Sequence, residues 1–185
     1  MSELIRRTKL LHGITYFVTR TTHCGKAKLY WLLYLLDFRV YAATSLSVTG
    51  LDYYAGVDGP VPLTLDQEFD SPQYDLAQQF HVDNLVLNNG RRLLALYARG
   101  NYEAEVFTDY ERETLHSLAT VHANSDASAI NEQMFLPTQP WRATYQAATR
   151  EYEPIEYRLV NPDEFAVGTD LWHLQRTNEL PAALR

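Results

Sequence analysis

The sequence predicts a mainly helical α+β domain, with a compact helical body around one central apolar helix and a small inserted β-hairpin or sheet. Three observations predict this class. Apolar residues recur at helical spacing in several segments, one of these segments is apolar nearly all round, and one stretch combines extended runs with an Asn-Gly turn. Strands do not alternate with long helices, so a doubly wound α/β fold is not expected.

Two helices are predicted before residue 45. The first covers about residues 3–21, because its apolar side chains fall at i, i+4, i+7 and i+8. The second covers about residues 26–44, with leucines on one face and aromatic residues on most of the remainder. A helix that is apolar on nearly every side is normally buried on several of them, so we expect this one to be the central core helix.

Shorter helices and strands are predicted in the middle of the chain. Residues 46–65 mix apolar residues with glycines and prolines, which is typical of short extended pieces and turns. Short helices are expected around residues 65–69 and 74–80. The runs at 82–87 and 93–99 flank Asn88-Asn89-Gly90, and Asn-Gly accepts the positive φ angles of a tight hairpin turn.

Three further helices are predicted after residue 108. The first covers about residues 109–122, where Thr108 and Glu111 fit a capping box and an apolar stripe follows. The other two cover about residues 126–134 and 139–149. Prolines and a glycine cut the tail, residues 151–185, into short pieces.

Composition and charge exclude several classes of function. Acidic residues outnumber basic ones by 23 to 16, a net charge of −7, so general attraction to nucleic acid or anionic membranes is not expected. The longest apolar run, residues 29–36, is far shorter than the about 20 residues of a membrane-spanning helix. The N-terminus lacks the apolar core of a secretory signal, and Cys24 is the one cysteine, so we expect a cytoplasmic protein without a disulfide framework.

A search for chemistry finds no catalytic residue, metal ligand or cofactor-binding motif. The six histidines include no helical pair with an intervening glutamate, and His81 with Asp83 on one strand face lacks a third ligand. Cys24 has no identifiable base, so an inert thiol is preferred to a nucleophile. A nucleophile elbow, a phosphate loop and a dinucleotide fingerprint are all missing. An enzyme would need a deep polar pocket with converging titratable groups, which nothing here indicates.

Aromatic residues suggest a surface for protein binding. The chain has 13 tyrosines, seven phenylalanines and three tryptophans, and such side chains are favoured both in cores and at interfaces. We place the contact surface on residues 53–62, with Tyr53, Tyr54, Asp58 and the neighbouring Trp141 as candidates. In an extended segment the two tyrosines point to opposite faces, so one can anchor the segment while the other is free. An inward orientation of both is the competing interpretation, and the hairpin at 82–99 is then the next candidate surface.

Two blocks of sequence carry a combination of short motifs. The first block spans residues 25–41 and 47–62, and the second lies within residues 111–141. The motifs are Lys28-Leu29, Leu32-Leu33-Tyr34-Leu35, Asp37-Phe38, Thr49-Gly50, Tyr53-Tyr54, Gly59-Pro60-Val61, Ser128 to Ile130 and Pro140-Trp141. In their order and spacing they resemble the Panacea domain of SocA-like antitoxins and phage-associated proteins of the GepA type. The sequence departs from the family at Gly56, Val57 and Asp58 and at Met134-Phe135-Leu136, which bears on partner contacts rather than on the fold.

The resemblance implies a non-enzymatic antitoxin that neutralises a cognate protein toxin, encoded by the adjacent gene, by direct binding. The alternative is a proteolytic adaptor that delivers the toxin to a bacterial protease, or a phage-associated interaction protein on the same fold. Residues 1–150 would form the Panacea-like antitoxin domain, and residues 151–185 a C-terminal extension that packs on it.

Overall fold

The computed structural model describes residues 2–86, 92–134 and 139–161, and this part of the chain is dominated by helices with small antiparallel sheets. Its α-helices and strands follow in the order α1 (Glu3–Arg20), α2 (Lys26–Thr44), β1 (Tyr53–Gly56), β2 (Gly59–Val61), α3 (Leu63–Asp70), α4 (Tyr74–Gln79), β3 (Phe80–Val86), β4 (Arg92–Ala98), α5 (Asp109–Val121), α6 (Ala127–Gln133), α7 (Pro140–Ala147) and β5 (Glu153–Ile155). The predicted fold class is therefore confirmed, and the predicted helices agree with α1 to α7 to within a few residues.

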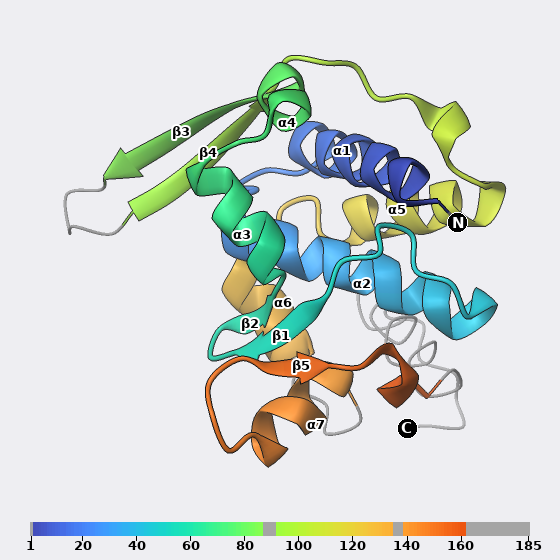
Figure 1. The fold of residues 1–185 in the computed structure, drawn as a ribbon, viewed down its shortest axis with the longest axis vertical. Coiled ribbons are helices and arrows are strands. Elements are labelled where there is room, and N and C mark those ends of the chain that lie inside the picture. The colour runs from blue at the N-terminus through green and yellow to red at the C-terminus, as the bar shows by residue number, and fades with distance from the viewer. Residues whose placement is uncertain (1, 87–91, 135–138, 162–185) are drawn as a thin grey trace.

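Helix α2 forms the centre of the core, as its sequence predicts. It crosses the middle of the molecule, with α1 and α5 on one side and the sheet that contains β1 on the other (Figure 1). Its leucines and aromatic side chains are almost completely buried, among them Leu29, Trp31, Leu32, Leu33, Tyr34, Leu35, Leu36 and Phe38. Removing this apolar surface from water is the main term that favours folding.

Polar contacts fix the helices around α2. The buried Lys9 ammonium of α1 lies 2.6 Å from a Glu111 carboxylate oxygen on α5, and Glu111 also completes the predicted capping box with Thr108. The Arg7 guanidinium binds Glu68 on α3 and Asp75 on α4, which lowers the pKa of the Asp75 carboxyl. These ion pairs fix the position of α1 relative to α3, α4 and α5.

The strands form two separate antiparallel sheets. The predicted hairpin is present as β3 and β4, which pair from Phe80↔Ala98 to Val86↔Arg92 and project from the helical body (Figure 1). Its expected Asn-Gly turn lies outside the described residues. The second sheet has the order β2-β1-β5, and proline occurs on both of its edge strands, Pro60 on β2 and Pro154 on β5.

Strand β5 joins the end of the described chain to the rest of the fold. It pairs with β1 from Tyr53↔Ile155 to Ala55↔Glu153. Next along the chain, the Tyr157 ring stacks on Phe38 of α2, with 4.5 Å between the ring centroids. The boundary at residue 150 stays a prediction, and residues 162–185 lie outside the described part. Among the described residues, no helix combines the length and the apolarity needed to cross a bilayer.

Replacing either Leu32 or Leu33 by alanine is expected to lower the free energy of unfolding by about 2–5 kcal/mol, since each change empties space in a closed core. Denaturant titration followed by circular dichroism measures the change. Leu46→Ala is the matched control, because Leu46 is 56% exposed and its loss should alter stability by less than about 0.5 kcal/mol. Unchanged midpoints for both core variants would show that α2 is not the core helix.

Candidate functional site

The predicted contact segment folds into the β1–β2 hairpin. Gly56 pairs with Gly59 across a turn made by Val57 and Asp58, which we call the tip. Gly59 has a φ angle of 137°, and a Cβ atom added there would lie 2.5 Å from the Trp31 indole nitrogen. Only glycine therefore fits at this position, because the backbone both takes a left-handed φ and lies directly on an aromatic ring.

Two buried tryptophans hold the tip from beneath. The Trp31 indole N–H of α2 donates to the Asp58 carbonyl oxygen at 3.3 Å, and the Trp141 indole N–H of α7 donates to the Gly56 carbonyl oxygen at 3.1 Å. The two ring systems pack edge to face, 5.2 Å apart. This tryptophan clamp fixes the backbone at Gly56, just before the exposed turn, and at Asp58, within it, so the turn is preorganised.

The structure places two of the four candidate contact residues in the core. Tyr53 and Trp141 are each only 1% exposed. The expected alternation holds, since Tyr53 points inward as an anchor while Tyr54 is half-buried on the outer face of the sheet. Tyr53 and Trp141 are therefore positioning residues in the free chain, because their rings fill the space under the hairpin. Asp58 is exposed at the tip.

A buried carboxylate ties this hairpin to the central helix. Asp37 on α2 accepts hydrogen bonds from the Val48 amide at 2.8 Å, the Thr49 amide at 2.7 Å and the Tyr53 hydroxyl at 2.9 Å, and also from the Thr49 hydroxyl. Burial raises the pKa of the Asp37 carboxyl, and these hydrogen bonds oppose the rise. The side chain thus fixes the segment that leads into β1.

Beside the tip lies a second exposed side chain that the sequence did not single out. Tyr152 is 44% exposed, and its ring reaches Gly56, where an added Cβ atom would lie 3.5 Å from the Tyr152 Cε1 atom. Its φ of 60° is uncommon for a residue with a bulky side chain. Together with Val57, which is 66% exposed, it forms an apolar pair that we call the contact ridge.

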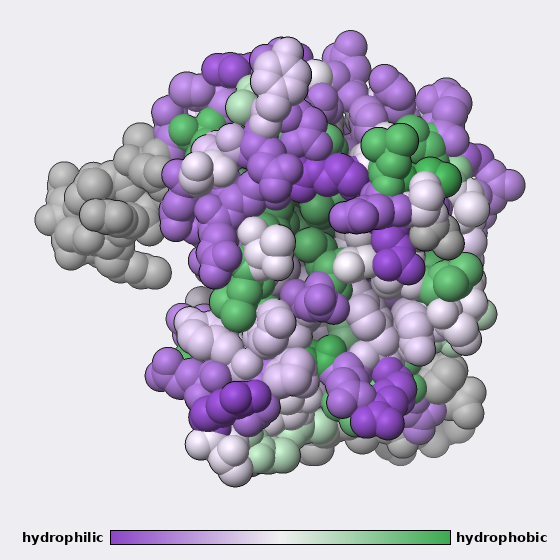
Figure 2. Space-filling view, viewed as in Figure 1, coloured by the Kyte–Doolittle hydropathy of each residue, from purple (hydrophilic) through white to green (hydrophobic). Residues whose placement is uncertain are grey.

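The contact ridge separates two hollows, each of which is lined by Gly56, Val57 and Tyr152. One has a volume of about 510 Å³ and continues along Tyr145 and residues 148–151. The other has a volume of about 410 Å³ and lies between the tip, the start of α2 and Asp66 of α3. In Figure 2 the molecule is indented on this flank, between the part that carries α3 and the part that carries the β1–β2 hairpin. A ridge between hollows offers a partner both a protrusion and recesses.

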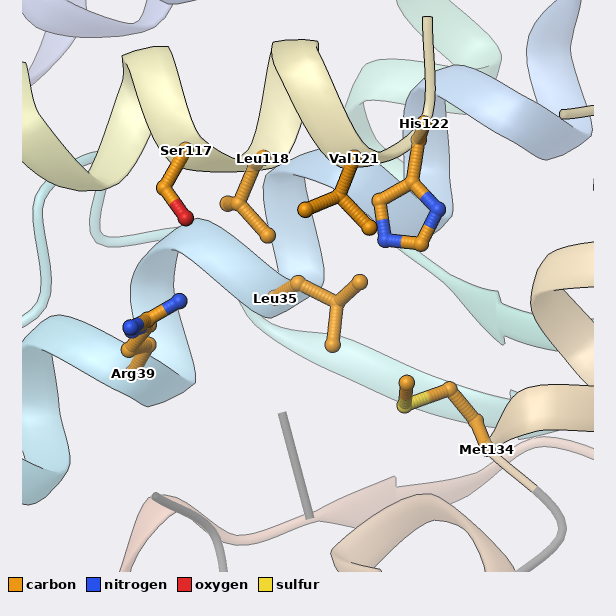
Figure 3. A pocket seen from close by; sticks show the side chains of 7 residues that line it. All are labelled: Leu35, Arg39, Ser117, Leu118, Val121, His122 and Met134. Carbon is orange, nitrogen blue, oxygen red and sulfur yellow. The ribbon is translucent and has the colours of Figure 1, made fainter. Parts of the chain in front are cut away.

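The space between α2, α5 and Met134 is far smaller than the two hollows beside the tip (Figure 3). Leu35 of α2 points into it from below Val121 and His122, and its volume is only about 10 Å³. That is room for about one water molecule, so this space belongs to the packing of the core rather than to a ligand site.

The groups considered for chemistry are spread over the structure. Within the described ranges, no three histidine, cysteine or carboxylate side chains come together as a metal site. His81 and Asp83 do share a strand face, where their side chains lie 2.9 Å apart. Burial raises the pKa of the Cys24 thiol, which disfavours the reactive thiolate.

Comparison with known proteins identifies a family. A family model described as "Antitoxin SocA-like, Panacea domain" matches residues 29–142, which is more than half of the chain. The matched range contains the tip, both tryptophans of the clamp and Asp37, and it ends before Tyr152. No curated protein and no solved structure matches the chain.

Gly59→Ala tests whether the tip is held as tightly as its contacts indicate. The added methyl group must displace the Trp31 indole and adopt an unfavourable φ, so we expect a loss of stability of about 1–3 kcal/mol. Gly13→Ala in α1 is the matched control. A Cβ atom there would meet Leu33 at an ordinary 3.9 Å, and alanine is the better helix former by about 1 kcal/mol. Equal thermal midpoints for the two variants would contradict a rigid tip.

Proposed function

This chain belongs to the family of SocA-like antitoxins with a Panacea domain, and from this premise we propose that it is the antitoxin of a toxin–antitoxin system. It neutralises a cognate protein toxin by direct binding in the bacterial cytoplasm. The toxin is the product of the adjacent gene, and the antitoxin itself acts without catalysis or a cofactor.

The observation that carries this proposal is the rigid, exposed tip beside the contact ridge. Val57 and Tyr152 present apolar side chains to solvent, while Asp58 adds a charge at the rim. Apolar and aromatic side chains at the centre of an interface, with charges around them, are typical of protein recognition. Because the tryptophan clamp already fixes the backbone, little conformational entropy is lost when a partner binds.

We place the toxin contact on this surface, with Tyr54, Val57, Asp58 and Tyr152 as the side chains that touch the toxin. Tyr54 stands on the outer face of the sheet, paired across the strands with Val61 and Pro154. Tyr53 and Trp141, the other two candidates from the sequence, support the contact from the core. Their substitution would weaken binding through the position of the tip.

Co-expression tests the proposed function directly. The adjacent gene expressed alone should stop growth, and co-expression of this chain should restore it. Immunoblots of the toxin then separate direct occlusion from the adaptor alternative, in which toxin levels fall only in cells that contain the protease. A neighbouring gene product that is harmless, or growth that this chain does not restore, would contradict the proposal.

Tyr152→Ala is expected to weaken toxin binding by about 2 kcal/mol, roughly 30-fold, because a large aromatic anchor is lost from the centre of the contact. Tyr74→Ala is the matched control, since Tyr74 is 81% exposed on α4, far from the tip (Figure 1). Affinity is measured by calorimetry, and thermal stability is measured in parallel. If neither tyrosine matters, or if affinity falls only in step with stability, the contact lies elsewhere, and the β3–β4 hairpin becomes the next candidate.

A further inference from the structure

The hollow between α2, α3 and the tip combines apolar walls with an excess of negative charge, and we call it the acidic hollow. Its walls are built from the ring of Tyr30 and the small or apolar side chains of three other residues, and its charged groups come from both helices and from the tip. The walls are formed by Ala27, Tyr30, Pro60 and Val61, and the charged groups are Lys26, Asp58 and Asp66.

Lys26, the one cation that the described residues contribute to this lining, is already paired. The Lys26 ammonium lies 3.0 Å from the Asp66 Oδ1 atom and 3.8 Å from the Asp70 Oδ1 atom. The Tyr30 hydroxyl also donates to Asp66 Oδ1, at 2.6 Å, which leaves Oδ2 without a hydrogen bond from the described residues. The Asp58 carboxylate, at the opposite rim, has no ion-pair or hydrogen-bond partner in the same part of the chain. Two carboxylates therefore face this hollow with open acceptor oxygens.

We propose that the acidic hollow accepts a long basic side chain, arginine or lysine, from the toxin. This inference rests on the proposed function and names the chemistry of the partner. The hydrocarbon stem of such a side chain would lie along the apolar walls, and its charged head would reach the Asp58 and Asp66 carboxylates. A recess with this lining selects a basic anchor over an acidic or purely apolar one.

Charge complementarity favours a basic partner over the two occupants that this chain could itself supply. A second copy would bring a net charge of −7 to an already acidic surface. Residues 162–185 carry four acidic and two basic side chains, so the tail also has the wrong sign: Asp163, Glu164, Asp170 and Glu179 against Arg176 and Arg185. A basic segment of another protein is the occupant that the electrostatics support.

The test measures the affinity of the purified full-length chain for the purified product of the adjacent gene, at 50 and 300 mM NaCl. Asp58→Lys should lower the affinity at least about tenfold at low salt, and the difference should shrink at high salt because exposed charges are screened. Lys26→Gln should strengthen binding, since it removes the cation that competes for the Asp66 carboxylate. Glu113→Lys, an equal charge change at an exposed site on α5, is the control and should stay within about twofold of the wild type.

A charge swap makes the test reciprocal. Each arginine and lysine of the toxin is replaced in turn by glutamate, and one such variant should bind Asp58→Lys better than it binds the wild-type chain. Thermal midpoints of all variants establish that they are folded.

The outcomes separate this inference from the function on which it rests. If the wild-type chain binds and neutralises the toxin, but Asp58→Lys and Glu113→Lys behave alike and no toxin variant restores binding, the inference is wrong and the antitoxin assignment stands. If the wild-type chain neither binds nor neutralises the product at either salt concentration, both are overturned.

Discussion

The hydrogen bonding of Asp37 is the interaction on which the arrangement around the tip depends. A carboxylate that is completely removed from water is strongly destabilising unless its oxygens are satisfied. Here the compensating donors are two backbone amides and two hydroxyls, so the segment from Val48 to Tyr53 must take one path relative to α2. Tyr53 opens β1, and β1 pairs with both β2 and β5. The carboxylate of a single helical residue therefore determines where the three-stranded sheet lies.

A second constraint acts nearer the start of the same helix. Trp31 and Tyr34, which lie on α2 one turn apart, contact the hairpin and α7 respectively, and the Tyr34 hydroxyl accepts a hydrogen bond from the Trp141 amide at 3.0 Å. Thus α2 makes three kinds of polar contact: the Asp37 carboxylate binds the segment that leads into β1, the Trp31 indole donates to the tip, and the Tyr34 phenol accepts from α7. The apolar side chains of the helix build the core, and these few polar atoms specify which segment of the chain packs at each place along the helix.

The helices could be predicted because their signals are local. The capping box at Thr108 and Glu111 and the apolar periodicity of α1 and α2 lie within single elements. Strand β5 could not be predicted, because it is three residues long, contains Pro154 and is defined only by its pairing with β1. For the same reason Tyr152 could not be predicted as a surface residue of the site, since its place beside Gly56 follows from that pairing. The sequence named the segment that forms the tip, but it left the burial of Tyr53 and Trp141 open, because an aromatic residue beside glycine or proline suits a core and an interface equally.

The tryptophan clamp binds main-chain atoms only. Both indoles donate to carbonyl oxygens, which every amino acid provides, so the clamp is indifferent to the side chains at positions 57 and 58. In the proposed binding mode, the hairpin separates two tasks that compete in many binding proteins, the maintenance of shape and the choice of partner. Substitutions at the tip would then alter what is recognised while the scaffold retains its packing. A domain built in this way can acquire new partners through surface changes, without first regaining lost stability.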